Sequence, residues 1–346
     1  MKHNETWFSK VMYAFNILLV VLTFCAYLLP FLAPKLFPFL SVLSLFLPVF
    51  IFLNVLFFGF WLLQFKKKML LSGLVLLLGI TFINKLYHFS SPPFEQEKTD
   101  IKIMSYNVRL FNLYEWLPKT DVPEQISTFV KQKNPNILCL QEFSPVETID
   151  FSSYKYKYIA TKGEKNKYGQ AIFSTYKIVD KGTIDFPDTS NNAIFVDIKI
   201  QNDTFRVYSM HLQSIKITQD IHENIDENKS KLLFKRIGKA FAKQQLQAEL
   251  IKKHIDSCSY PVILCGDMNN SAFSYVYRTL KGNLNDTFEE VGAGFGKTYH
   301  YKYYPARIDY IFADKKFTPK SFTNFDSFFY SDHYPILATL NLEKQE

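Results

Sequence analysis

The chain has 346 residues, of which 48% are hydrophobic, and carries a formal net charge of +8 at pH 7. Residues 1–89 hold seven lysines and one acidic residue, so the totals of 40 basic and 32 acidic residues leave 33 and 31 for the rest, a net charge of only +2. The excess of basic over acidic residues therefore comes mainly from the N-terminal part, and it is weak support for nucleic-acid binding. Cys139 and Cys265 lie inside apolar strand patterns and are predicted to be buried thiols, and Cys25 lies in an apolar run. Only Cys258 is expected to be exposed, so no disulfide framework is predicted.

Three long apolar runs open the chain, at about 11–29, 37–65 and 69–86. A membrane-spanning helix needs about 20 such residues, and none of the three runs has the polar face of a soluble surface helix. A cleaved signal peptide would explain one run but not three. Residues 1–88 are therefore predicted to be a membrane anchor with three transmembrane helices.

Lysines beside these runs predict the orientation of the anchor. Five of them (Lys2, Lys10 and 66–68) flank one side, whereas Lys35 and Lys85 flank the other. Because cytoplasmic flanks carry the excess of basic residues, the N-terminus is expected in the cytoplasm and everything after Ser90 outside it. In a bacterium that compartment is the periplasm.

Residues 89–100 form a short linker in which Pro92 and Pro93 stop the last apolar helix. From 101 to 346, strand-like runs such as IKIMSYNV, NILCLQEF, TFRVYSMHL and PVILCGDM alternate with helical patterns, which predicts a layered α/β domain. One helix is expected after Thr120 or Asp121, running to about Asn134.

A second helix is expected over about 230–256. Its apolar face is predicted to consist of Leu233, Ile237, Phe241, Leu246 and Leu250. It is rich in lysine, which is compatible with contact to anionic lipid or another polyanion, but a solvated helix face is the favoured interpretation.

Polar side chains recur where these strands end. In GDMNN, Asp267 and Asn269 are two residues apart, so an extended backbone directs both to one side. The other strand-end residues are Asn107, Glu142, His211, Asp309, Asp332 and His333. Because α/β sheets assemble their sites at strand ends, these side chains are expected to converge.

In this order, the blocks SYNVR, LQEF, GQAIFS, MHLQS, GDMNN, RIDYIF and SDHYPI resemble the endonuclease/exonuclease/phosphatase superfamily of metal-dependent phosphoesterases. The resemblance covers about 100–344. It implies a four-layered α/β sandwich of two packed mixed β-sheets flanked by helices, with the site at one end. Each block is weak alone, and the specificity comes from their joint order.

The resemblance also implies a role for each residue. Glu142 would be the principal ligand of Mg²⁺ (or Mn²⁺), helped by Asn107 and Asp332. Asp267 would orient or deprotonate the attacking water, and Asn269 would help to hold it. The catalytic set is completed by His333, paired with Asp309 against the phosphate, and by His211. Oxygen donors without a cysteine cluster suit such a hard cation.

The substrate stays open at this point. A phospholipid head group fits the membrane anchor, whereas a tethered extracytoplasmic endonuclease or exonuclease acting on DNA or RNA is the alternative. A non-catalytic receptor on the same fold would predict gaps in the acid and histidine set. The run Tyr299–Tyr304 could line a substrate cleft or form an edge hairpin, and Arg278 is assigned to a salt bridge rather than to phosphate. The lipid bilayer and the phosphoester are the predicted partners, and no protein partner is predicted.

Overall fold

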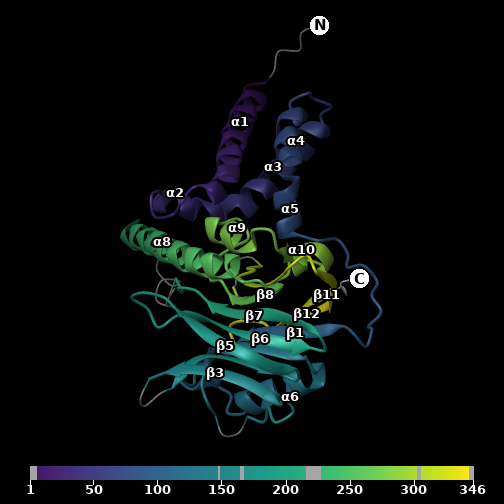
Figure 1. Ribbon diagram of the computed structural model, residues 1–346. Coiled ribbons are helices and arrows are strands. Elements are labelled where there is room, and N and C mark those ends of the chain that lie inside the picture. Colours follow the sequence, from purple (N-terminus) through teal and green to yellow (C-terminus); the bar gives the residue numbers. More distant parts are fainter. Residues whose placement is uncertain (1–5, 147–148, 164–166, 216–226, 302–304, 343–346) are drawn as a thin grey trace.

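A computed structural model describes residues 6–146, 149–163, 167–215, 227–301 and 305–342. Helices from the N-terminal part rise from one side of a layered α/β domain (Figure 1). The elements thus form an N-terminal helical part and a layered α/β part.

The N-terminal helices follow the three predicted apolar runs, with one difference. They are α1 (Trp7–Leu28) with η1 (Leu29–Phe31), then α2 (Pro38–Val42), η2 (Leu43–Phe46) and α3 (Leu47–Leu62), then α4 (Met69–Leu78) and α5 (Ile80–Leu86). Among the described residues, Trp7–Phe31 and Pro38–Leu62 are each long and apolar enough to cross a membrane. The third run is bent by 70° between α4 and α5, so it adds a third span only if the bent pair is one.

The bend lies at Gly79, where the chain passes very close to α1. A Cβ on Gly79 would lie 1.9 Å from the hydroxyl oxygen of Tyr27, so a larger residue there would have to displace this buried side chain. Elsewhere the helices are joined by buried polar pairs: Asn16 donates to Ser72 (2.6 Å) and accepts from Trp61 (3.0 Å). Such bonds satisfy polar groups that lipid could not.

The α/β domain contains two six-stranded sheets. The first sheet has the order β11 (Phe317–Asn324), β12 (Ile336–Leu342), β1 (Ile101–Asn107), β2 (Ile137–Phe143), β4 (Tyr168–Ser174) and β3 (Tyr156–Lys162). The second has the order β5 (Lys177–Asp185), β6 (Asn192–Ile200), β7 (Asp203–His211), β8 (Val262–Asp267), β10 (Asp309–Ala313) and β9 (Asn285–Asp286). The pairs β1/β2 and β7/β8 are parallel and the other pairs are antiparallel.

Helices cover both outer faces of the paired sheets, which confirms the predicted four-layered sandwich (Figure 1). The helix α6 (Val122–Lys133) packs on the first sheet, and α8 (Glu227–Asp256), α9 (Tyr275–Lys281) and α10 (Thr287–Val291) lie on the side of the second; the short turn η3 (Arg109–Asn112) follows β1. Between the sheets, side chains such as Ile103, Cys139, Val196 and Ile263 are fully buried. Strands covered on both faces explain the nearly continuous apolar runs.

The predicted apolar face of the helix over 230–256 is wrong in its second half. Ile237 and Phe241 are buried, but Leu246 and Leu250 are 43% and 38% exposed. The step of five residues from Phe241 to Leu246 turns the helix by about 140° relative to a shared face, so the later leucines point outward. The buried positions of that half include Gln244 instead.

The N-terminal helices pack directly on the α/β domain. Phe39 of α2 stacks on Phe234 of α8, with ring centroids 6.3 Å apart. Phe82 of α5 stacks on Phe273, just before α9, at 6.4 Å. The guanidinium of Arg278 lies 4.4 Å from the ring centroid of Phe31, a cation–π contact rather than the predicted salt bridge.

Candidate active site

Backbone pairing brings three of the expected residues into one row across the second sheet. His211 at the end of β7 pairs with Asp267 at the end of β8, and Asp267 pairs with Asp309 at the start of β10. In the first sheet, Asn107 ends β1 beside β2, and Glu142 follows within β2. The predicted site residues therefore come together from strand ends of both sheets.

Gly266 lets β8 approach β7 at this row. Its φ is +130°, and a Cβ there would lie 2.1 Å from the carbonyl oxygen of Met210. No other residue type fits such a backbone without displacing β7. The glycine before Asp267 is thus the local reason why the aspartate lies beside His211.

Glu142 owes its direction to an irregularity in β2. The pairing of β2 with β4 shifts register between Leu140 and Phe143, and Glu142 itself has a φ of +48°. A β-bulge of this kind re-aims a side chain at a strand end. The Nδ2 of Asn107 then donates to Glu142 Oε1 (3.3 Å) and to Asp267 Oδ2 (3.0 Å), which links carboxylates from the two sheets.

Asp267 is fully buried and accepts three hydrogen bonds from two asparagines. Besides Asn107, the backbone N–H and Nδ2 of Asn269 donate to it at 2.8 and 2.9 Å. Burial raises the pKa of Asp267 to about 6, with the positive field of His333 opposing the rise. A carboxylate with such a pKa accepts a proton more readily than an ordinary aspartate does.

His333 forms a buried pair with Asp309. Its Nδ1–H donates to Asp309 Oδ2 at 2.9 Å, which leaves Nε2 facing Asp267 Oδ2 at 3.6 Å. Burial alone would lower the pKa of His333, but the carboxylates of Asp309 and Asp267 outweigh it and raise the pKa well above its ordinary value. The ring of Tyr299 packs edge-on against His333, with centroids 5.0 Å apart.

The donor set fits a hard divalent cation with its anionic substrate. The Nε2 of His211 is buried without a hydrogen-bond partner and lies 3.6 Å from both Glu142 Oε1 and Asp267 Oδ2. Ligand atoms of Asp267, Asp309 and His333 lie within 4.8 Å of one another. The unpartnered buried nitrogen could contact a bound group, and the oxygen donors beside it suit Mg²⁺ or Mn²⁺.

Asp332, expected beside the metal, pairs with a residue that the sequence analysis did not single out. Its Oδ2 lies 2.9 Å from Nη1 of Arg109, whose guanidinium stacks 3.8 Å from the ring centroid of Trp116. Residues 109–112 all have φ between +42° and +64°. Four consecutive non-glycine residues in this region are strained and have no sequence signature, although Arg109 stands in the SYNVR block.

A second missed residue, Gln244 of α8, holds the segment that follows His211 and the loop that contains Asn269. Its Nε2 donates to the carbonyl oxygens of Gln213 (2.7 Å) and Asn269 (3.1 Å), and its Oε1 accepts from Asn270 (2.7 Å). Nothing in the periodicity marks this glutamine as buried. Of the aromatic run 299–304, Tyr299 contacts His333, whereas residues 302–304 lie outside the described part of the chain.

Two family profiles match the chain. Residues 104–333 match the Endonuclease/Exonuclease/phosphatase family, and residues 9–86 match a Domain of unknown function (DUF8431). None of the curated proteins is similar enough to count as a relative.

Several solved structures share the fold. An endonuclease/exonuclease/phosphatase from Beutenbergia cavernae is 15% identical with a TM-score of 0.52, covering 71% of this chain and 72% of that one. A humanized D. rerio TDP2 is 20% identical (TM-score 0.53; 70% and 100% covered). The human Nocturnin catalytic domain with bound sulfate anion is 18% identical (TM-score 0.52; 75% and 98% covered). At these identities the likeness establishes the fold alone.

Proposed function

The chain belongs to the endonuclease/exonuclease/phosphatase family, and on that premise we propose that it is a membrane-anchored, Mg²⁺-dependent phosphoesterase acting on phospholipid head groups. Members of the family are metal-dependent phosphoesterases, and this chain is an enzyme of that class. The proposal goes further in three respects: the metal, the roles of the residues and the substrate.

Glu142 would be the principal ligand of Mg²⁺, with Asn107 and Asp332 completing the protein's share of the site. Once bound, the cation supplies positive charge that neutralises the phosphoryl oxygens of an anionic ester. The amide of Asn107 already joins Glu142 to Asp267, so the same contact would keep the metal side and the water side of the site in register.

The remaining residues would carry the proton transfers. Asp267 would accept a proton from the attacking water, and Asn269 would hold that carboxylate in place through its two hydrogen bonds. His333, kept protonated by Asp309, would donate from Nε2 to a phosphoryl oxygen. The unpartnered Nε2 of His211 would offer a further contact to the same phosphate.

The observation that carries the lipid substrate is the short path from the site to the N-terminal helices. Four residues after His211, Ile215 packs on the cluster that contains Val42 of α2. Four residues after Asn269, Phe273 packs in the cluster of the apolar helices. Four residues span at most about 14 Å, so both sides of the site lie close to the anchor and to any head group beside it.

The basic flanks support an extracytoplasmic catalytic domain with a cytoplasmic N-terminus. Lys66 lies beside Ser9, with its Nζ 3.2 Å from Ser9 Oγ, at the end of the helices remote from the α/β domain. Lysines gathered at that end favour its retention in the cytoplasm. Protease treatment of intact spheroplasts should cleave the α/β domain, and protection of that domain would refute this orientation.

The test uses the full-length protein in phospholipid nanodiscs with Mg²⁺, and compares release of head-group products with cleavage of single-stranded and duplex DNA and of RNA. Asp267→Asn should lower metal-dependent lipid turnover by about 10²–10⁴-fold. The matched control, Asp203→Asn, changes an exposed aspartate at the opposite end of β7 and should keep full activity. Cleavage of nucleic acid but not of lipid would contradict the proposal in favour of a tethered nuclease.

A further inference from the structure

The outer face of α8 carries an exposed stripe of leucine and lysine. Leu232, Leu246 and Leu250 are 67%, 43% and 38% exposed, although leucine is normally buried. Lys235 and Lys239 are exposed at neighbouring positions. At about 100° per residue, these five side chains fall on one face of the helix.

That stripe adjoins the face of α8 that packs on α2, about 100° round the helix from Phe234 and Gly238. The opposite face of α8 is buried toward the second sheet, with Gln244, Ala248 and Ile251 inaccessible to solvent. Figure 1 shows α8 in the outermost layer of the sandwich, directly beside the N-terminal helices. The stripe is therefore exposed beside the contact between α8 and the N-terminal helices.

The contact of α8 with α2 indicates how deep the stripe would lie relative to a lipid bilayer. Pro38, the first residue of α2, also begins the second candidate span, Pro38–Leu62. A Cβ on Gly238 would lie 3.0 Å from the carbonyl oxygen of Pro38, so α8 and the start of the span touch through their backbones. The end of a span lies in the lipid head-group layer, and α8 lies there with it.

The side chains around this contact suit a negatively charged lipid surface. No acidic residue occurs between 228 and 248, whereas Lys35, Lys235 and Lys239 are exposed. Phe37 and Phe39 are exposed beside them, at 43% and 63%. Basic residues that reach head groups, with apolar residues that enter the acyl boundary, are the composition of interfacial helices.

We propose that the outer face of α8, with the 35–40 segment, lies in the head-group layer and binds anionic phospholipids. This rests on the part of the proposed function that puts the N-terminal helices in a bilayer, but not on the phosphoesterase activity. The consequence is that lipid charge would hold the catalytic domain against the membrane and its site at head-group height.

The first test measures where α8 lies. In a Cys25→Ser/Cys258→Ser background, spin labels are placed at Leu246→Cys on α8, at Leu56→Cys in α3 and at Lys157→Cys on β3, in nanodiscs. Labels at 56 and 246 should be more accessible to oxygen than to a water-soluble nickel chelate, and the label at 157 should show the reverse. Lipid exposure at 56 with water exposure at 246 would overturn the surface alone; water exposure at both would overturn the anchor as well.

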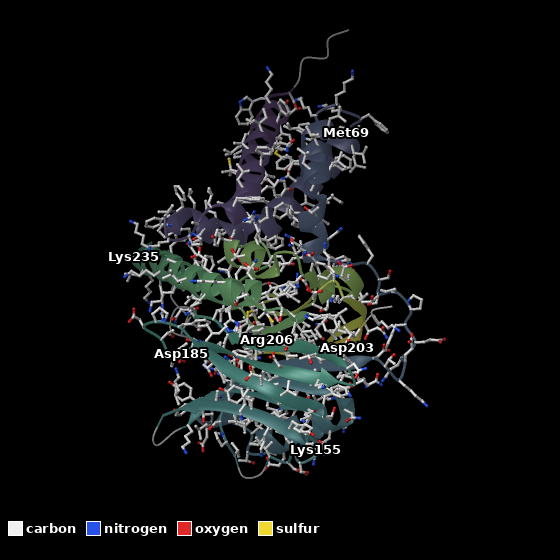
Figure 2. All side chains as sticks on the ribbon, viewed as in Figure 1. Met69, Lys155, Asp185, Asp203, Arg206 and Lys235 are labelled. Carbon is white, nitrogen blue, oxygen red and sulfur yellow. The ribbon has the colours of Figure 1, made fainter. Side chains whose placement is uncertain are left out.

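The second test measures the lipid preference. Spin-labelled phosphatidylglycerol should be retained beside the protein in preference to spin-labelled phosphatidylcholine, and Lys235→Gln/Lys239→Gln should reduce this preference by roughly fivefold per lysine at low salt. The control Lys155→Gln/Lys157→Gln removes the same charge and should change nothing, because Lys155 lies at the opposite end of the domain (Figure 2) and Lys157 is exposed two residues further along the chain. An unchanged preference in the α8 variant, or an equal loss in the control, would refute the proposal.

Discussion

Gly266→Ala tests whether the approach of β7 and β8 positions the site. At a φ of +130°, a side chain costs about 1–3 kcal/mol in backbone strain. The new Cβ would also lie 2.1 Å from the carbonyl oxygen of Met210 and 2.7 Å from its nitrogen, both backbone atoms that cannot rotate away. Forcing the strands apart adds about 1–3 kcal/mol. The sum, about 2–6 kcal/mol, corresponds to a fall of roughly 5–20 °C in the unfolding temperature.

The strand separation should also reduce catalysis, because it moves Asp267 away from His211. A misplacement near 1 Å costs about 10²-fold in rate. Both quantities are measured on the full-length protein in detergent, by thermal unfolding and by Mg²⁺-dependent hydrolysis of bis-p-nitrophenyl phosphate. Gly59→Ala is the matched control, since a Cβ there meets nothing within 4 Å and favours the helix. A Gly266→Ala variant as stable and active as wild type would refute this account of the site.

Three further outcomes are expected. Asp309→Asn should lower turnover by about 10²–10⁴-fold, because His333 loses the charge that keeps it protonated; wild-type rates would contradict that role. Chelation should abolish hydrolysis, and added Mg²⁺ should restore it and raise the unfolding temperature, as binding to the folded state requires. Burial alone would raise the pKa of Asp100, but hydrogen bonds from Asn341 and others, with the charge of Lys320, lower it. This carboxyl therefore stabilises the fold fully above its unfolded pKa of about 3.9, and the stabilisation is lost as the pH falls from there through the lower pKa of the folded state. The free energy of unfolding that Asp100→Asn loses in urea, about 1–3 kcal/mol at pH 7, should therefore shrink in acid.

Much of the architecture was accessible from local patterns. Strands buried on both faces had to be nearly continuous in apolar residues, and the ends of such strands had to expose their polar groups at one edge. That reasoning brought Asn107, His211 and Asp267 to one place, and the backbone pairing and hydrogen bonds agree. The apolar runs likewise predicted the N-terminal helices, because apolar runs of about 20 residues are typical of membrane-spanning helices.

The predictions that were wrong or missing concern which face of a helix a side chain lies on and contacts between segments that are distant in sequence. Leu246 and Leu250 looked like core residues because they are apolar, yet the helix had turned by then and Gln244 took the buried place. That glutamine is satisfied only by the loops after β7 and β8, which no local window contains. The partner of Asp332, Arg109, depends on a left-handed turn for which its residues show no preference.

The sequence by itself determined the composition of this protein: an apolar segment, an α/β domain and the polar residues that end its strands. Hydrophobicity, periodicity and turn chemistry act over a few residues, so they are legible in order along the chain. Only the tertiary structure decided that α2 packs on α8, that the outer leucines of α8 are exposed beside this contact, and that the candidate site lies within a few residues of the N-terminal helices. Those relations depend on side chains far apart in sequence finding partners that bury or satisfy them, and this is settled only when the whole chain is packed.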